Sequence, residues 1–296
     1  MEEGKKSFFA SLEPKSALIV GVVAGALVLC TVGFIILLVV VLNGKASAKN
    51  AGGEIVDNAA QQPEAQSFQV EKSDRPTAEL FVMAYCPFGL QMEKAFLPVM
   101  QLLKDKADLS IKFVSYAMHG KKELDENTRQ YCIESEQPAK FLAYINCFVG
   151  KDDYSACLSA AKIDQAKMNK CIAATDNKFG ITKKFDDKST WLSGRYPLYP
   201  VQEETNTLYG VQGSPSLVIN GIHLVSSQEE LAQCNSTGAK CIIAAVNRTP
   251  EAVKQAVCAA FNNPPAECQQ TLSSSAMQAG FGLSAGSDTG AAACGN

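Results

Sequence analysis

The chain has 296 residues, of which 19% are charged, and a formal net charge of −3. It has no basic stripe and no interleaved basic and aromatic residues, which argues against nucleic-acid binding. Its two histidines, His119 and His223, are too few and too far apart for a His-rich metal site. Eleven cysteines are the strongest compositional signal, because a cytosolic protein rarely carries so many without metal ligation. We therefore expect an oxidising compartment, no metal ion and no organic cofactor.

The N-terminal part of the chain predicts a membrane anchor. A short segment, residues 1–15, precedes residues 16–43, an apolar stretch without a single charged residue. About 20 apolar residues span a bilayer, whereas the apolar region of a secretory signal has about 7–15. We therefore predict an uncleaved transmembrane helix. Residues 46–48 have the small-x-small pattern of a cleavage site and leave removal of the segment as the alternative.

The orientation of this anchor follows from the cysteines more than from charge. The flanking lysines nearly balance, with Lys5, Lys6 and Lys15 before the anchor and Lys45 and Lys49 after it. Ten cysteines follow the anchor and are expected in an oxidising compartment. We predict a single-pass protein with a cytoplasmic N-terminus and an extracytoplasmic C-terminal domain. Its expected partners are exported cysteine-containing proteins or peptides, with a membrane protein or a small thiol as a redox partner.

Two further stretches, residues 44–76 and 271–296, are rich in small and polar residues and lack an apolar period. Such segments bury too little apolar surface to fold alone, so we predict a flexible stalk and a flexible C-terminal tail. Between them, residues 77–270 are enough for one well-buried domain of mixed α/β character.

This domain begins with a strand, a helix and a second strand. Residues 78–85 form an apolar run of strand length that ends just before Cys86. Apolar residues recur at helical spacing over residues 88–104, where Pro98 predicts a kink. Residues 109–116 alternate as a second strand. Within about 40 residues this order makes a βαβ unit.

The second half of the domain predicts an insertion, a hairpin and a last helix. Residues 121–192 carry helical patterns, no strand signal and four cysteines, which indicates a disulfide-stapled helical insertion. Residues 216–225 predict a hairpin that turns at Asn220-Gly221, and Thr249-Pro250 opens a helix that runs to about residue 261. The complete order is that of the thioredoxin-like fold, an α/β fold, with a helical insertion after the second strand.

Cys86 lies at the junction of the first strand and the first helix. A thiol there faces the unpaired N–H groups and the positive end of the helix dipole, which favour the thiolate, the attacking species in disulfide exchange. Pro87 suits the first helical turn, where no N–H donor is needed. On residue type alone, a buried structural cysteine at the end of a strand is the alternative.

Pro215, just before the hairpin, is the second candidate. The resemblance to thioredoxin-like folds implies a cis proline at this place, opposite the reactive cysteine, where it exposes backbone for a substrate peptide. The predicted catalytic set is therefore Cys86, Pro87 and Pro215. The predicted substrate groove consists of Tyr85, Phe88, Gly89 and Ser214. Core packing explains the aromatic residues of this groove equally well.

The chain resembles the gamma-interferon-inducible lysosomal thiol reductase family and the DsbA-type thiol–disulfide oxidoreductases. The lysosomal family carries a signature of the form CQHGxxECxxNxxxxC, and the matching positions here hold His119-Gly120, Glu123, Asn127 and Cys132. The two cysteines missing from the signature fall at Ala117 and Leu124. The resemblance spans about residues 78–268 and implies a thioredoxin-like fold with thiol–disulfide chemistry.

The departure from both families is at Gly89, which stands where their CxxC motif has its second cysteine. A single thiol attacks a disulfide but cannot resolve the mixed disulfide by itself. The first hypothesis is a monothiol exchanger acting on exported proteins, which predicts an exposed and reactive Cys86. The alternative is a redox-inactive binding or chaperone module, in which Cys86 is buried or unreactive. A third possibility is a thiol that carries glutathione or a similar small thiol.

The remaining cysteines suggest a disulfide framework. The insertion contains four, which allow three pairings; these are Cys132, Cys147, Cys157 and Cys171. Cys234 and Cys241 are close enough to close a small loop, and Cys258 can reach Cys268. Cys294, in the tail, is left over with Cys86. We hypothesise that it is a tethered resolving thiol, with an incidental terminal cysteine or an intermolecular link as the alternative.

Two polar features are expected to be structural. His119 ends the second strand and is more often a structural than a catalytic residue on its type alone. Glu123, Asp125 and Glu126 start a helix, where acidic residues complement the dipole, so we predict a solvated cap.

Overall fold

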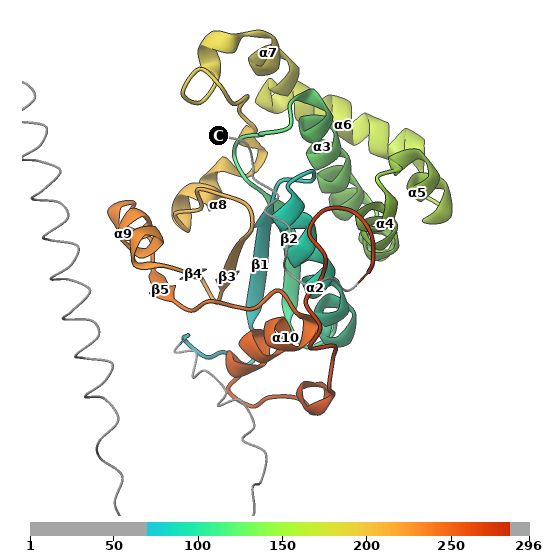
Figure 1. The fold of residues 1–296 in the computed structure, drawn as a ribbon. Helices are drawn as coiled ribbons and strands as arrows, with labels where there is room; N and C mark the ends of the chain where they lie inside the picture. The colour runs from blue at the N-terminus through green and yellow to red at the C-terminus, as the bar shows by residue number, and fades with distance from the viewer. Residues whose placement is uncertain (1–69, 285–296) are drawn as a thin grey trace, which may run out of the picture. The chain divides into compact units, whose positions relative to one another are not determined.

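The computed structural model describes residues 70–284, which contain a five-stranded sheet of order β2-β1-β3-β4-β5 (Figure 1). β1 (Thr77–Val82) pairs in parallel with β2 (Asp108–Phe113) and antiparallel with β3 (Ser216–Ile219). β3 continues into the hairpin strand β4 (Ile222–Val225), and β5 (Cys241–Ile243) lies parallel to β4. A parallel β1–β2 pair joined by a helix, next to an antiparallel hairpin, is the thioredoxin-like arrangement predicted from the sequence.

Nine α-helices lie within residues 70–284. In chain order they are α2 (Pro87–Leu103), α3 (Lys121–Glu136), α4 (Pro138–Lys151), α5 (Tyr154–Ala160), α6 (Gln165–Phe179), α7 (Ile181–Asp186), α8 (Glu203–Leu208), α9 (Gln228–Ser236) and α10 (Pro250–Ala259). Short 3-10 turns follow as η2 (Lys188–Thr190), η3 (Pro200–Gln202) and η4 (Ala266–Gln269). The helices α3 to α7 come between β2 and β3 and gather beside the sheet (Figure 1), which confirms the helical insertion.

The two faces of the sheet bury different clusters, because successive side chains of a strand point to opposite sides. Leu80 and Val82 of β1 point to the face covered by α2 and α10, where the larger core lies. Phe81 and Met83 belong to a smaller cluster on the other face, and Cys86 belongs to it as well. The sheet thus separates the main core from the surroundings of the candidate thiol.

Local capping explains where the helices begin. Pro87 and Pro250 occupy the first turns of α2 and α10, where no N–H donor is needed, and Thr249 caps α10 by accepting the N–H of Ala252. α2 continues through Pro98 to Leu103, so the helix tolerates this proline in its interior.

Four disulfides staple the domain. They join Cys132 to Cys171, Cys147 to Cys157, Cys234 to Cys241 and Cys258 to Cys268. The first two select one of the three pairings possible within the insertion, and the last two confirm the predicted short loops. They take up eight of the nine cysteines in residues 70–284, and Cys86 is the ninth.

Both predicted flexible ends contribute to the domain where the structure describes them. Val70 is buried and Ser73 pairs with Phe261. Residues 70–76, predicted as part of the stalk, therefore belong to the folded domain. At the other end, residues 271–284 of the predicted tail pack along α2 and α4, and we call residues 277–284 the C-terminal strap. Composition alone missed these segments because their contacts are made largely by backbone groups.

Three predicted features lie outside the described residues: the transmembrane segment 16–43, most of the stalk, and Cys294. Among the helices of residues 70–284, none has the length and apolar character needed to cross a bilayer. The elements that sequence patterns did not predict, α8, α9 and β5, are short, and short segments carry weak periodic signals.

Candidate functional site

Cys86 is the N-cap residue of α2. Its Sγ accepts a hydrogen bond from the backbone N–H of Gly89 at 3.4 Å. On its other side the thiol donates to the backbone carbonyl of Ser214 at 3.5 Å. The sulfur therefore lies between the first turn of α2 and the loop that precedes β3.

The loop before β3 contains a cis peptide bond between Ser214 and Pro215, which the resemblance to thioredoxin-like folds implied. The hydroxyl of Ser214 accepts a hydrogen bond from the backbone N–H of Met83 at 2.9 Å. Since Met83 directly follows β1, this bond ties the cis-proline loop to the segment that carries Cys86.

Gly89 leaves no room for a larger side chain at this position. A Cβ atom on Gly89 would lie 2.6 Å from Oγ of Ser214 and 3.2 Å from the carbonyl oxygen of Met83. Such close approaches force a neighbouring atom to move. The Ser214 hydroxyl therefore occupies space that the second cysteine of a CxxC motif would need.

The Cys86 side chain is buried, with 1% of the residue exposed. It packs in the smaller cluster, whose buried members are Phe81, Met83, Cys86, Val114, Val211 and Val218. Phe88 and Tyr116 pack against this cluster as half-buried side chains. Our first hypothesis predicted an exposed thiol, and that prediction is wrong for this conformation.

The segment just before Cys86 is held by two buried residues of α3. One carboxylate oxygen of Glu123 accepts the N–H of Tyr85 at 2.9 Å, and the other accepts the N–H of Met118 at 2.8 Å and of His119 at 3.0 Å. Nδ1 of His119 lies 2.8 Å from Oε1 of Glu123. Asn127, one helical turn on, accepts the N–H of Ala84 at 3.1 Å.

These contacts correct the prediction of a solvated acidic cap. Glu123 and Glu126 are both fully buried, and only Asp125 faces solvent. Glu126 pairs with Arg129 and accepts the hydroxyl of Tyr144 at 2.7 Å. The carboxylates are buried because each has several donors, which is the condition for burying a charge.

The resemblance had singled out Glu123 and Asn127 by their spacing, without assigning them a role. The structure brings both against the backbone that leads into Cys86. Cys132, the last residue of the same motif, anchors α3 through its disulfide to Cys171. The matching residues Glu123 and Asn127 therefore bind the backbone that leads into Cys86, and His119 contacts Glu123.

The segment just after Cys86 is held by the C-terminal strap. The N–H of Gly280 donates to the carbonyl of Pro87 at 2.9 Å. Lys94, on the next turns of α2, donates to the strap carbonyls of Gln278, Gly280 and Gly282 at 2.5, 2.8 and 2.7 Å. The strap thus lies across the first turns of α2.

Tyr85 packs on the strap side of the site. Its ring makes edge contacts with Phe148 and Phe281, with ring centroids 5.8 and 5.7 Å away, and Nζ of Lys122 lies 4.1 Å from its centroid. Burial raises the pKa of Tyr85 to about 12, with a further contribution from a hydrogen bond with Asp152. Tyr85 is therefore a packing residue, as the alternative in the sequence analysis had it.

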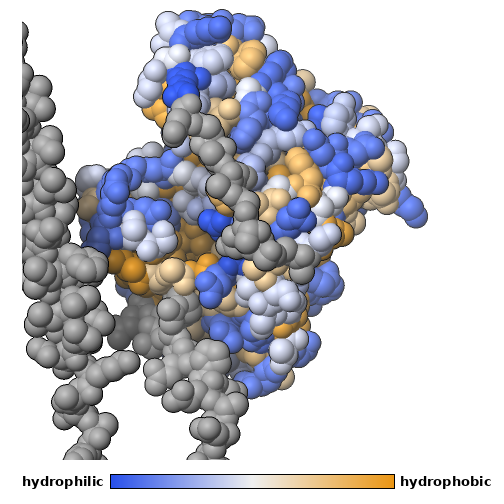
Figure 2. All heavy atoms as spheres, in the orientation of Figure 1, coloured by the Kyte–Doolittle hydropathy of each residue, from blue (hydrophilic) through white to orange (hydrophobic). Residues whose placement is uncertain are grey.

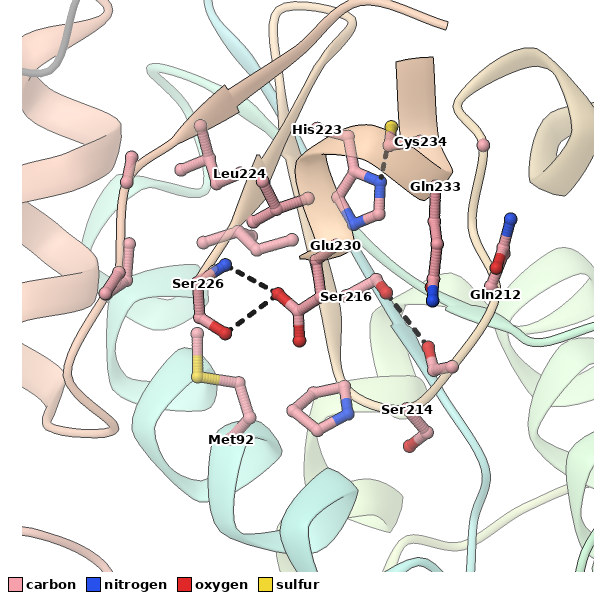
Figure 3. Close-up of a pocket in the computed structure, with 18 of the residues that line it drawn as sticks. Met92, Gln212, Ser214, Ser216, His223, Leu224, Ser226, Glu230, Gln233 and Cys234 are labelled. Atoms are coloured by element: carbon pink, nitrogen blue, oxygen red, sulfur yellow. Dashed lines mark hydrogen bonds between the residues drawn. The ribbon is translucent and has the colours of Figure 1, made fainter. Parts of the chain in front are cut away.

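A cavity of about 420 Å³ opens beside the cis proline (Figure 3). Ser214 and Pro215 line it, but the other predicted groove residues, Tyr85, Phe88 and Gly89, do not. Figure 2 shows apolar residues in the hollow between α9 and α10. The further lining residues used below are Met92, His223, Glu230, Cys234 and Arg248.

Arg248 connects this cavity to the first turns of α2. Its guanidinium lies 4.9 Å from the centroid of Phe88 and donates to Oε1 of Gln91 at 2.7 Å. Sequence analysis did not select Arg248, because an arginine in a loop carries no signal of its own. Its charge makes this end of the cavity suited to an acidic or carbonyl-bearing ligand.

One buried carboxylate lies further along α2. Glu93 is fully buried, neither of its carboxylate oxygens has a hydrogen-bond partner, and burial raises its pKa to about 8. It lies seven residues after Cys86, so the two are about two helical turns apart on one side of the helix. The protonated acid is the form that this environment favours.

No protein-family model and no curated protein matches the chain. Three of the solved structures that do match are thiol–disulfide proteins of bacteria. Oxidized Mtb DsbA shares 14% sequence identity at a TM-score of 0.40, covering 65% of this chain and 86% of its own. Reduced DsbG from Mycobacterium tuberculosis shares 16% at a TM-score of 0.36, covering 65% and 81%. MdbA, a thiol-disulfide oxidoreductase from Actinomyces oris, shares 14% at 0.38, covering 64% and 83%.

The chain is thus similar to thioredoxin-like oxidoreductases of the DsbA type. Because these TM-scores are all below 0.5, the assignment of the fold rests on the sheet order, the hairpin and the crossover helix. Fold and site together define a thioredoxin-like domain in which one cysteine at a helix N-terminus faces a cis proline.

Proposed function

We propose that this protein is a thiol–disulfide exchange protein that uses Cys86 as a single active-site thiol. The observation that carries the proposal is the position of its sulfur, between the N–H of Gly89 and the carbonyl of Ser214 beside a cis proline. A helix N-terminus supplies N–H donors that stabilise a thiolate, and a thiolate is required for attack on a disulfide. A thioredoxin-like fold by itself does not determine this activity.

In the first step, the Cys86 thiolate attacks one sulfur of a substrate disulfide. The substrate S–S bond breaks, a mixed disulfide forms on Cys86, and the second substrate sulfur leaves as a thiolate. A second thiol then attacks the mixed disulfide and regenerates Cys86. That thiol belongs to the substrate in an isomerisation, or to a small thiol or another cysteine in a net exchange.

Cys294 is the resolving thiol that we propose from this chain. Gly280 is bonded to Pro87, next to Cys86, and Cys294 follows fourteen residues further along the chain. A chain of fourteen residues spans at most about 50 Å when fully extended, so its length allows the thiol to reach the site. An intermolecular disulfide through Cys294 is the competing outcome.

A second candidate function is a redox-inactive binding or chaperone module. The observation in its favour is the burial of Cys86, of which 1% is exposed, together with the Ser214 hydroxyl in the place of a second thiol. In this function the cavity beside Pro215 binds a partner chain and Cys86 is a core residue.

We further propose that residues 16–43 anchor the protein in a membrane, with a cytoplasmic N-terminus and the described domain outside. The uncharged length of this segment and the disulfides of the domain support the proposal. Exported cysteine-containing proteins are then its substrates. Extraction of the full-length protein from membranes with alkaline carbonate tests the anchor, and release into the supernatant would contradict it.

The decisive experiment is alkylation of Cys86 in the native full-length protein, read by peptide mass spectrometry and compared with the denatured protein. The exchanger predicts that the native thiol reacts and forms a mixed disulfide with an oxidised peptide. Cys86→Ser abolishes that product, and Cys294→Ser lengthens its lifetime. Reaction only after denaturation, with peptide binding retained in Cys86→Ser, would instead establish the binding module.

A further inference from the structure

A second group of sulfur atoms lies beside β4, where His223 is the register partner of Val218 in β3. His223 on β4, Cys234 on α9 and Cys241 at the start of β5 each bring one ligand atom into a group whose atoms all lie within 4.8 Å of one another. Within residues 70–284 this is the one group of three or more His, Cys, Asp or Glu side chains arranged to hold a metal ion. We call it the β4–β5 cluster.

One separation in this cluster matches that of a nitrogen and a sulfur ligand on one zinc ion. Nδ1 of His223 lies 3.5 Å from Sγ of Cys234 (Figure 3). A tetrahedral zinc ion with ordinary Zn–N and Zn–S bond lengths holds a nitrogen and a sulfur about 3.6 Å apart, and two sulfurs about 3.8 Å apart. The two sulfurs are now joined in a disulfide, so the dithiol must form before both can bind a metal ion.

The surroundings leave a coordination position open. His223 and Cys234 are buried, and both line the cavity of about 420 Å³. Glu230 of α9 lines the same cavity, but its carboxylate accepts hydrogen bonds from Ser226, so the protein ligands are the three of the cluster. Three protein ligands with an accessible fourth position are typical of zinc sites that bind a water or a substrate.

The backbone of the loop at Gly210 packs closely against Cys234. Gly210 has a φ of +60°, and a Cβ atom there would lie 3.1 Å from Sγ of Cys234 and 2.6 Å from Oγ1 of Thr237. Glycine is therefore required where this loop passes the sulfur. The next contact is made by Tyr209, whose carbonyl oxygen lies 3.1 Å from Nδ1 of His223.

We propose that the β4–β5 cluster is a redox-controlled metal site, which binds one zinc-type divalent cation when the Cys234–Cys241 disulfide is reduced. A dithiol reductant supplies two electrons and two protons, opens the disulfide to two thiols and becomes a disulfide itself. The cation then binds both sulfurs as thiolates and releases two protons. Nδ1 of His223 is the third ligand; its proton moves to Nε2 and its contact with Tyr209 is replaced. This site is independent of the exchange proposed at Cys86.

The test is a cobalt titration of the purified full-length protein after anaerobic reduction with a phosphine, with thiol mapping by mass spectrometry. Cobalt(II) bound by thiolates has charge-transfer absorption that reports sulfur ligation directly. We expect one cobalt ion per chain, displaced by zinc, and no such band in the oxidised protein. His223→Gln should weaken binding about tenfold or more while both thiols remain.

The matched comparison is between two pairs of cysteines. Cys234→Ser with Cys241→Ser should abolish the cobalt–thiolate band, whereas Cys147→Ser with Cys157→Ser, which removes a disulfide of the insertion, should leave it intact. Binding that survives the first pair, or a band unchanged by His223→Gln, overturns the proposal. A Cys234–Cys241 disulfide that opens only when the domain unfolds, followed by circular dichroism, overturns it as well.

Discussion

The two flanks of Cys86 are held in place by different means. The segment before it is bound by α3, through a buried carboxylate and a buried amide that accept backbone N–H groups of Ala84 and Tyr85. The turn after it is bound by the C-terminal strap, through one backbone hydrogen bond to Pro87 and the three bonds of Lys94. The first support lies within the core, and the second lies along the edge of the domain.

This difference indicates which flank opens first. Loss of the α3 contacts leaves several N–H donors and a charge without partners in the interior, which is costly. The strap contacts are made mainly through backbone carbonyls, which regain hydrogen bonds from water when the strap opens. Local opening occurs first in such weakly held segments. We therefore expect the turn after Cys86 to open before the segment that α3 holds.

The largest effect is expected on the α3 flank. Glu123→Ala removes four hydrogen-bond contacts and should destabilise the protein by about 3–5 kcal/mol, as expected for breaking a buried, hydrogen-bonded charge. Urea unfolding of the full-length protein measures the change. The control is Asp125→Ala on the same helix, an exposed partner of Lys121 whose loss should matter by less than about 0.5 kcal/mol. Equal effects of the two substitutions would contradict the assignment of Glu123 as the support of this flank.

The second test concerns the helix that the strap covers. Burial raises the pKa of Glu93 to about 8 from an ordinary value of 4.5. Between these two pH values the folded state keeps a proton that the unfolded state has released, so stability falls as pH rises through this window. Glu93→Gln, which stays neutral, should match the wild type near pH 5 and exceed it by roughly 2–4 kcal/mol near pH 8.

Unfolding curves at pH 5, 7 and 8.5 measure this difference. Glu136→Gln, on the exposed part of α3, serves as the control and should leave the pH dependence unchanged. A constant difference between Glu93→Gln and the wild type at all three pH values would mean that Glu93 keeps the same charge throughout.

The two flanks also differ in how far the sequence predicts them. Apolar periodicity and turn residues predict the first strand, the first helix and the hairpin. Cys86 and Pro215 were also identified from the sequence as the candidate site. The spacing of a family motif pointed to Glu123 and Asn127. The burial of Glu123 was not predicted, because an acidic residue in the first turn of a helix is usually exposed. Tyr85 and Glu123 are 38 positions apart, and local sequence contains no information that brings such distant residues into contact.

The strap and the β4–β5 cluster were beyond the reach of the sequence for a related reason. Residues 277–284 have the composition of a tail, and their contacts use backbone carbonyls, which every residue has. Cys234 and Cys241 are brought to His223 by a nine-residue helix and a three-residue strand, which are too short for a period to be detected. Tertiary packing decides both features.

The third prediction tests the strap itself. Phe281 makes ring contacts with Tyr85 and Phe148, with centroids 5.7 and 5.3 Å away. Phe281→Ala should lower global stability by only about 1–2 kcal/mol, because the side chain is half-buried. It should speed hydrogen exchange at the Gly280 amide and alkylation of Cys86. Leu283→Ala, a residue 66% exposed, is the control and should change neither. Unchanged alkylation in Phe281→Ala would mean that the thiol is reached by another route.

The most specific test of the site concerns Gly89. Gly89→Cys should destabilise by about 1–3 kcal/mol, because its Cβ would approach Oγ of Ser214 to 2.6 Å. The Ser214 hydroxyl is also held by the N–H of Met83, so it does not simply rotate away. We therefore expect Gly89→Cys alone to form little disulfide with Cys86 under mild oxidation, and the same change combined with Ser214→Ala to form it readily.

Mass spectrometry of the oxidised full-length proteins distinguishes the single from the double variant, with Ser214→Ala alone as the control. Ready disulfide formation in the single variant would mean that the hydroxyl does not exclude a second thiol, and that the loss of the CxxC pair is a property of residue 89 alone.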